Sequence, residues 1–168
     1  FHTKNHFVKL AVFFPLMIFV AFFNIKFWHN FSYIIYFIVI LLLIYVSFFG
    51  IKSSGSQRWM DVYFFVLQPS ELMKIAIIMC LAKYYHRLKV ENVNSFTSII
   101  IVLSVILIPT IFVVSQPDLG TSILIALSGL IILWLGGVKI KYFIFLFFTF
   151  LISLPFIISF LKPYQKLR

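Results

Sequence analysis

The sequence predicts an all-α fold, a polytopic bundle of transmembrane helices, on the strength of two observations. Of its 168 residues, 63% are hydrophobic and only 11% are charged, whereas soluble domains average about 45–50% apolar and about 25% charged residues. The apolar residues also gather into runs close to the roughly 20 residues that a membrane-spanning helix needs. We therefore expect residues 1–168 to form a single transmembrane domain.

Six such runs follow one another along the chain. The predicted spans cover residues 8–27, 31–49, 69–85, 96–114, 119–135 and 142–161. A polar joint at His29 and Asn30 separates the first two spans, and Gly136-Gly137 is a helix-stop signal after the fifth. The longest connector, residues 50–68, has an aromatic second half that is expected to lie in the membrane interface. Lys83, with the basic residues after it, marks the exit of the third span.

Three of the predicted spans contain a proline, namely Pro15, Pro109 and Pro155. Proline breaks most soluble helices, but a membrane bundle tolerates it as a kink because neighbouring groups re-satisfy the freed carbonyl. We therefore interpret these prolines as kinks within continuous spans.

The net charge of +10 lies mostly in the short connectors. It favours contact with membrane lipids that have anionic headgroups, or with an anionic substrate. No aromatic–basic module typical of nucleic-acid binding is present, so no nucleic-acid partner is expected. Basic residues divide almost evenly between the two sides of the predicted bundle, and the positive-inside rule therefore gives no orientation.

Glu71 and Lys74 are the first candidate functional residues. They lie three apart on the third predicted span and so share a helix face. Glu71 has a simple structural explanation, because Gln68 can cap the helix, Pro69 suits its first position and an early acid favours the helix dipole. Capping does not explain Lys74, a cation near a helix N-terminus inside an apolar run. The two residues either line a functional polar pocket or form a purely structural ion pair.

Two further groups offer polar side chains. Arg58 beside Trp59 is either a headgroup anchor or an arginine fork for a phosphate. Asp118 begins the fifth span as a helix cap, or it binds a cation or positions a sugar. Gly120 and Thr121 follow it, and a glycine early in a transmembrane helix allows close packing. The sequence shows no dedicated metal site.

These residues belong to three ordered motifs. Ser-Gly-Ser-Gln-Arg-Trp-Met-Asp spans residues 54–61, Gln-Pro-Ser-Glu-x-x-Lys spans 68–74 and Gln-Pro-Asp-Leu-Gly-Thr spans 116–121. Together they resemble the signatures of the SEDS family, the bacterial proteins of shape, elongation, division and sporulation. The wording is closer to the elongation branch, which maintains rod shape, than to the division branch. The resemblance extends over nearly the whole chain, to residues 164–168.

The resemblance implies a ten-helix peptidoglycan glycosyltransferase of the bacterial cytoplasmic (inner) membrane that polymerises lipid II beside a class B penicillin-binding transpeptidase. The six spans would be helices two to seven, with Arg58 and Asp118 facing the periplasm. The chain begins at Phe1 rather than Met, and we interpret it as incomplete at both ends. The family's catalytic acid would lie beyond Arg168, so we expect residues 1–168 alone to be inactive.

The chemistry of such a reaction suits the residues at hand. A carboxylate base deprotonates the acceptor sugar hydroxyl, and cations bind the departing lipid pyrophosphate. The resemblance assigns Glu71 and Lys74 to a central cavity. The candidate residues for substrate or pyrophosphate binding are Arg58, Trp59, Lys74, Asp118, Lys162, Lys166 and Arg168. No cofactor is required from the sequence, although a divalent cation, Mg²⁺ or Mn²⁺, would suit phosphate and carboxylate oxygens.

Two other functions fit a polar cavity among kinked helices. A lipid flippase or transporter would use the same features. A non-catalytic subunit could instead position a transpeptidase. Polymerisation of lipid II in vesicles separates the enzyme from both alternatives.

Overall fold

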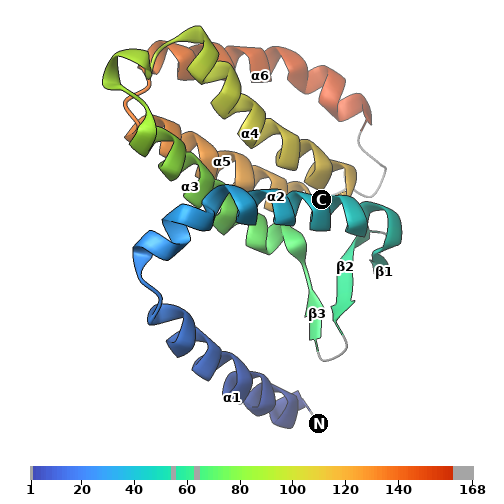
Figure 1. Ribbon diagram of the computed structural model, residues 1–168. Coiled ribbons are helices and arrows are strands. Elements are labelled where there is room, and N and C mark those ends of the chain that lie inside the picture. The colour runs from blue at the N-terminus through green and yellow to red at the C-terminus, as the bar shows by residue number, and fades with distance from the viewer. Residues whose placement is uncertain (1, 54–55, 63–64, 161–168) are drawn as a thin grey trace.

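The computed structural model describes residues 2–53, 56–62 and 65–160, which form a helix bundle with a small sheet at one end (Figure 1). Within these residues the helices are α1 (His2–Ala21), α2 (Ile25–Phe49), α3 (Pro69–Arg87), α4 (Phe96–Ser115), α5 (Leu119–Leu135) and α6 (Ile140–Phe160). A short 3-10 helix, η1 (Val90–Asn92), precedes α4. The six helices of this described part confirm the all-α class.

The core of the molecule lies among α2, α3, α4 and α5. Leu43, Met73, Ile77, Val102 and Ile125 bury their side chains completely at the contacts of these four helices. Helix α1 extends away from them, and α6 lies at the edge of the bundle beyond α4 (Figure 1). This arrangement leaves many large apolar side chains on outward faces, as expected for helices in contact with lipid.

Two helices of the described part, α2 and α4, are long and apolar enough to cross a membrane. Helix α5, with 17 residues, is apolar but shorter. Helix α3 carries Glu71, Lys74, Lys83 and Arg87, which makes it the most charged of the core helices. The number of membrane crossings therefore stays a prediction.

The joint between the first two helices differs from the prediction. Helix α1 ends at Ala21 and α2 begins at Ile25, so His29 and Asn30 lie inside α2 rather than between the helices. The reason is Asn24, whose side chain accepts a hydrogen bond from the Lys26 amide at 3.0 Å. Asparagine is one of the strongest N-caps, and it begins α2 at this point.

The connector between α2 and α3 forms an antiparallel sheet that the sequence analysis did not predict. Its strands are β1 (Ile51–Ser53), β2 (Ser56–Val62) and β3 (Phe65–Leu67), in the order β1-β2-β3. Trp59 pairs with Ile51 on one side, and Met60 pairs with Leu67 on the other. The sheet contacts α2 and α3 and fixes Arg58 at the end of the bundle.

A side chain of α2 compensates for Pro109 in α4. Proline has no amide hydrogen, so Pro109 leaves the carbonyl of Val105 without its usual helical donor. The Tyr36 hydroxyl donates to that carbonyl at 2.9 Å. A side chain from a neighbouring helix thus satisfies the freed backbone group, as predicted.

Glycines end α5 and allow it to pack closely on α4. The helix ends at Gly136 in a Schellman motif, in which Gly137 has a φ of 85° and its amide donates to the Trp134 carbonyl at 2.9 Å. This confirms the predicted stop signal. Gly129 permits close helix packing, because an added Cβ would lie 2.5 Å from Ile106 Cγ1 of α4.

The close packing predicted at Gly120 is absent. No heavy atom of the described chain lies within 4 Å of a Cβ built at Gly120. This glycine is exposed in the first turn of α5, before the helix enters the contact with α4, so the position has no neighbour to approach.

Candidate functional site

The three motif stretches meet at the sheet end of the bundle. The first lies on β2, the second begins α3, and the third forms the turn between α4 and α5. Their meeting point is the carboxylate of Asp118, which lies 3.3 Å from Arg58 Nη1 and accepts a hydrogen bond from Gln68 Nε2 at 2.9 Å. Segments separated by up to 60 positions thus share one polar cluster, which we call the Asp118 cluster: Arg58, Gln68, Ser70, Asp118 and Thr121.

Asp118 has a dense set of donors. Its side chain is only 8% exposed, so an unpaired charge there would be costly. The Thr121 hydroxyl donates to Oδ2 at 2.9 Å, and the Thr121 amide donates to Oδ1 at 3.4 Å. The second bond confirms the capping interpretation of Asp118. Protein donors thus reach both oxygens of the carboxylate.

Gln68 does not act as predicted. It occupies the cap position of α3, but its side chain makes no capping hydrogen bond. The amide nitrogen donates instead to Asp118 and, at 3.0 Å, to the Ser70 hydroxyl. Capping would need the amide oxygen of Gln68 as an acceptor for a helix N–H, whereas the contacts of this side chain are made by its amide nitrogen, whose bond to the buried Asp118 carboxylate is charge-assisted.

A second glutamine locks the α4–α5 turn onto α2. Gln116 is buried, and its amide nitrogen donates to the Leu43 carbonyl at 3.0 Å and to the Ser47 hydroxyl at 2.8 Å. These bonds fix the residue two positions before Asp118. The Gln-Pro-Asp motif, in the α4–α5 turn, is therefore attached to α2 through Gln116.

Glu71 and Lys74 form an ion pair beside the Asp118 cluster. Lys74 Nζ lies 2.8 Å from Glu71 Oε2, and both residues lie in the first two turns of α3. The glutamate side chain is 55% exposed and the lysine side chain 27%, so the pair reaches the surface of the described part. The pairing predicted from the spacing is present. The central-cavity role stays a prediction.

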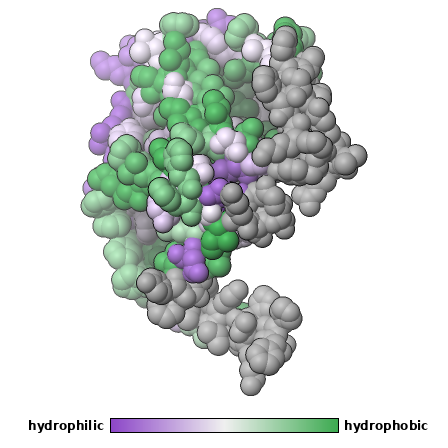
Figure 2. Space-filling view, turned by 90° about the vertical axis from the view of Figure 1, so that its right-hand side faces the viewer, coloured by the Kyte–Doolittle hydropathy of each residue, from purple (hydrophilic) through white to green (hydrophobic). Residues whose placement is uncertain are grey.

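Arg58 is partly exposed after pairing with Asp118. Its side chain is 28% exposed, although Nε is buried without a hydrogen-bond partner among the described residues. Guanidinium groups bind phosphate oxygens through pairs of N–H groups, and the exposed part of the side chain is where such a contact would form. Trp59, the next residue, is half-buried in the strand. Seen from the strand side, hydrophilic patches lie between larger apolar areas (Figure 2).

The remaining candidates are not placed at this site. Lys162, Lys166 and Arg168 lie outside the described residues. Over the described part of the chain, no group of three or more His, Cys, Asp or Glu side chains is arranged to hold a metal ion.

Comparison with known proteins identifies the family. The model of the FtsW/RodA/SpoVE family, described as cell cycle protein, matches residues 1–168. The chain belongs to this family. Its membership confirms the SEDS resemblance and makes the chain part of a membrane protein.

Two relatives represent both branches of the family. The chain is 33% identical over 174 residues to the probable peptidoglycan glycosyltransferase FtsW of Buchnera aphidicola subsp. Schizaphis graminum, covering 100% of the chain and 49% of the relative. It is 46% identical over 105 residues to the peptidoglycan glycosyltransferase MrdB of Escherichia coli K12, covering 62% of the chain and 28% of the relative. The chain thus spans about half the length of these FtsW/RodA/SpoVE relatives, or less.

A solved structure has the same fold. It describes structural coordination of polymerization and crosslinking by a peptidoglycan synthase complex, and one of its chains superposes with a TM-score of 0.83 at 21% identity. The match covers 96% of this chain and 48% of that one. This chain therefore shares its helix arrangement with that chain of the complex.

Lys83 lies in a position that its sequence context did not predict. It was predicted to mark the exit of the third span, but it is only 4% exposed. Its ammonium donates to the Asn30 carbonyl at 2.6 Å and lies 4.7 Å from the centroid of the Tyr33 ring. The signal was present in the spacing, because Lys83 follows Ile77 and Cys80 on the buried face of α3.

Proposed function

We propose that the protein is a peptidoglycan glycosyltransferase that polymerises lipid II at the outer face of the bacterial cytoplasmic membrane, which it crosses several times. The observation that carries this proposal is the convergence of three distant motifs on Asp118. This cluster lies beside an ion pair at the same end of the bundle, in a chain 46% identical over 105 residues to a peptidoglycan glycosyltransferase.

The reaction needs a base and cations. The acceptor sugar hydroxyl attacks the anomeric carbon of the donor, the glycosidic bond forms, and the bond to lipid pyrophosphate breaks. A carboxylate takes the hydroxyl proton, and cations stabilise the charge on the pyrophosphate. Asp118 and Glu71 each pair with a cation. The family resemblance implies that the base lies in sequence beyond Arg168.

Arg58 and Lys74 supply positive charge at this end. Asp118 is a positioning residue, because it fixes one arm of the Arg58 guanidinium, whose side chain stays 28% exposed. Glu71 plays the same part for Lys74, which it contacts at 2.8 Å. Both cations are thus oriented by carboxylates before substrate arrives, and preorganised charge costs no rearrangement during the reaction.

A divalent cation has no prepared site among the described residues. The Asp118 oxygens already accept bonds from Arg58, Gln68 and Thr121, and no acidic cluster accompanies them. We therefore assign no step of the reaction to a metal.

Within the family we place the protein in the elongation branch, with a class B penicillin-binding transpeptidase as partner. The wording of the motifs at 54–61 and 116–121 supports the elongation branch. The similarity to a chain from a complex that coordinates polymerization and crosslinking supports the partner.

The test is polymerisation of lipid II by the full-length protein in vesicles. We expect glycan chains, their loss in Arg58→Gln, and unchanged product in Lys89→Gln, an exposed lysine at the other end of the bundle. Transbilayer movement of labelled lipid II without glycan product would instead establish a flippase.

Complementation separates the two branches. We expect the full-length protein to restore rod shape to E. coli cells depleted of MrdB and to leave division unrepaired in cells depleted of FtsW. The reverse pattern would assign it to the division branch.

A further inference from the structure

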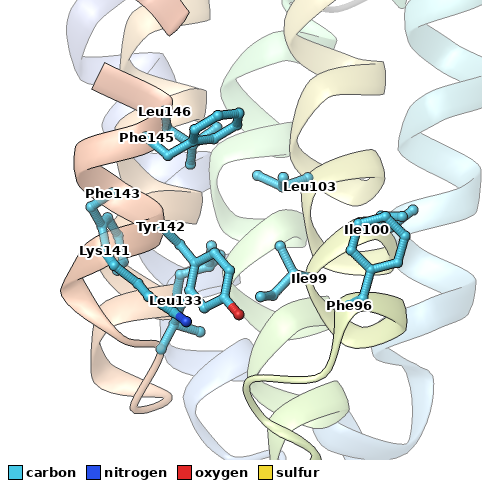
Figure 3. A pocket seen from close by; sticks show the side chains of 11 residues that line it. Phe96, Ile99, Ile100, Leu103, Leu133, Lys141, Tyr142, Phe143, Phe145 and Leu146 are labelled. Atoms are coloured by element: carbon cyan, nitrogen blue, oxygen red, sulfur yellow. The ribbon is translucent and has the colours of Figure 1, made fainter. Parts of the chain in front are cut away.

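An apolar pocket of about 420 Å³ lies between α4 and α6 (Figure 3). Phe96 and Leu103 of α4 face Tyr142 and Leu146 of α6 across it, and Leu133 of α5 forms its floor. Its volume lies in the range of about 300–1,000 Å³ that is usual for small-molecule sites. The edge residues Phe96 and Phe145 are largely exposed, so the pocket opens to the outer surface of the bundle.

This pocket is remote from the Asp118 cluster. It lies beside the start of α4 and the end of α5, whereas Asp118 lies in the turn between the end of α4 and the start of α5. The Tyr142 hydroxyl donates to the Asn94 carbonyl at 3.2 Å, and the Lys139 amide donates to Asn94 Oδ1 at 2.9 Å. These bonds hold the start of α6 against the turn before α4, while farther along the two helices diverge (Figure 1).

The rim of the pocket is basic. Lys141 is the one charged side chain among the described residues that line it, and its ammonium lies 5.0 Å from the centroid of the Tyr142 ring. Lys141 also occupies the first turn of α6, where the positive end of the helix dipole disfavours a cation. An anion bound there would interact favourably with both the ammonium and the helix terminus. Lys139, two residues earlier, is exposed and adds to the positive field.

We propose that this pocket binds an anionic glycerophospholipid, with an acyl chain between Phe96 and Leu146 and the phosphate at Lys141. Apolar walls suit a hydrocarbon chain, and a lysine at the rim suits a phosphate. The exposed edge residues Phe96 and Phe145 leave the pocket open at the outer surface of the bundle. A second protein helix would fit the apolar walls but would leave the positive rim without a counter-charge.

Photolabelling tests the site. The full-length protein is reconstituted in vesicles that contain trace phosphatidylglycerol with a diazirine in one acyl chain, and phosphatidylcholine with the same label serves as the comparison. We expect phosphatidylglycerol to label peptides from residues 96–103 and 141–146. Lys141→Gln should lower this labelling about fivefold, toward the phosphatidylcholine level, because one lysine near a membrane surface attracts an anionic lipid by about that factor.

Two further variants complete the design. Leu103→Trp fills the pocket and should abolish labelling by both lipids, whereas Lys89→Gln, an exposed lysine at the same end, should leave it unchanged. Equal labelling by the two lipids, insensitivity to Lys141→Gln, or crosslinks to another helix in place of lipid would each overturn the proposal. Abundance in the membrane identifies any variant that fails to fold, and Lys141→Gln then decides the outcome.

Discussion

A single carboxylate, Asp118, connects three segments that are far apart in the sequence. Its side chain caps α5, pairs with Arg58 on β2 and accepts a bond from Gln68 at the start of α3. The cap and the ion pair are not alternatives here, because the two oxygens of one carboxylate serve both. Sequence reasoning weighed each possibility separately, since no spacing rule reports that residues 58 and 118 are neighbours.

The Arg58–Asp118 pair should show strong coupling in a double-mutant cycle. We expect Arg58→Ala and Asp118→Ala each to reduce thermal stability in detergent. The double variant should be less damaged than the sum, with a coupling of about 0.5–3 kcal/mol. Each single change leaves a charge without its partner in a poorly hydrated site. Additive losses would show that the 3.3 Å contact contributes no coupling.

Tyr36 and Pro109 should be coupled in the same way. Tyr36→Phe removes the donor to the Val105 carbonyl and should cost about 0.6–1.7 kcal/mol, the usual range for such bonds in membrane bundles. In a Pro109→Ala background the new amide can bond to that carbonyl, so Tyr36→Phe should cost much less. Thermal unfolding of the four proteins measures the difference. An equal cost in both backgrounds would refute the role given to Tyr36.

At the scale of elements, α5 contains two glycines that the sequence does not distinguish. Gly129 lies against Ile106 of α4, whereas Gly120 has open space around it. A small residue in a transmembrane helix indicates that close packing is possible, but only the helix arrangement shows which glycine is used. Within the described residues, the close approach occurs at Gly129 and not at Gly120.

The glycines provide a matched pair of variants. Gly129→Ala should destabilise the protein by about 1–3 kcal/mol, because overpacking forces the α4–α5 contact apart. Gly120→Ala should be neutral or slightly stabilising, since alanine favours a helix by up to about 1 kcal/mol over glycine. Ile106→Ala should relieve the damage of Gly129→Ala in the double variant. Equal effects of the two single changes on the melting temperature would contradict this packing.

The helices themselves were largely predictable, and the connectors were not. Apolar runs gave four of the six helices, α3 to α6, to within two residues, because membrane-length hydrophobicity is a local property. The predicted position of the α1–α2 joint was wrong because the apolar run continues past Asn24. The Asn24 cap, and not the end of the apolar run, sets the start of α2. The sheet over residues 51–67 was missed because its strands are short and depend on pairing with one another.

At the scale of the whole molecule, the bundle has two chemically different ends. The Asp118 cluster and the Glu71–Lys74 pair occupy one end, while Lys141 and the apolar pocket occupy the other. The near-even distribution of basic residues between the two ends does not reveal this difference, because a count of charges does not show which side chains are paired. The family resemblance implies, and we predict, that the Asp118 end faces the outside of the cell.

Cysteine labelling tests this orientation. In a Cys80→Ala background, a cysteine at Ser115, beside the Asp118 end, should react with an impermeant maleimide added to intact cells. One at Asn92, in η1 at the opposite end, should react only after the membrane is opened. Both positions are exposed, so accessibility within the fold does not limit the reaction. Labelling of Asn92 in intact cells would reverse the orientation.

The Glu71–Lys74 pair offers the most direct test of the proposed glycosyltransferase. Glu71→Gln, Lys74→Met and the double change are made in the full-length protein, and membrane abundance and lipid II polymerisation are scored separately. Both side chains are partly exposed, so removing them together should cost little stability. We predict near-normal abundance with polymerisation lost in all three variants. A double variant that is abundant and fully active would contradict the assignment and leave the pair with a structural role alone.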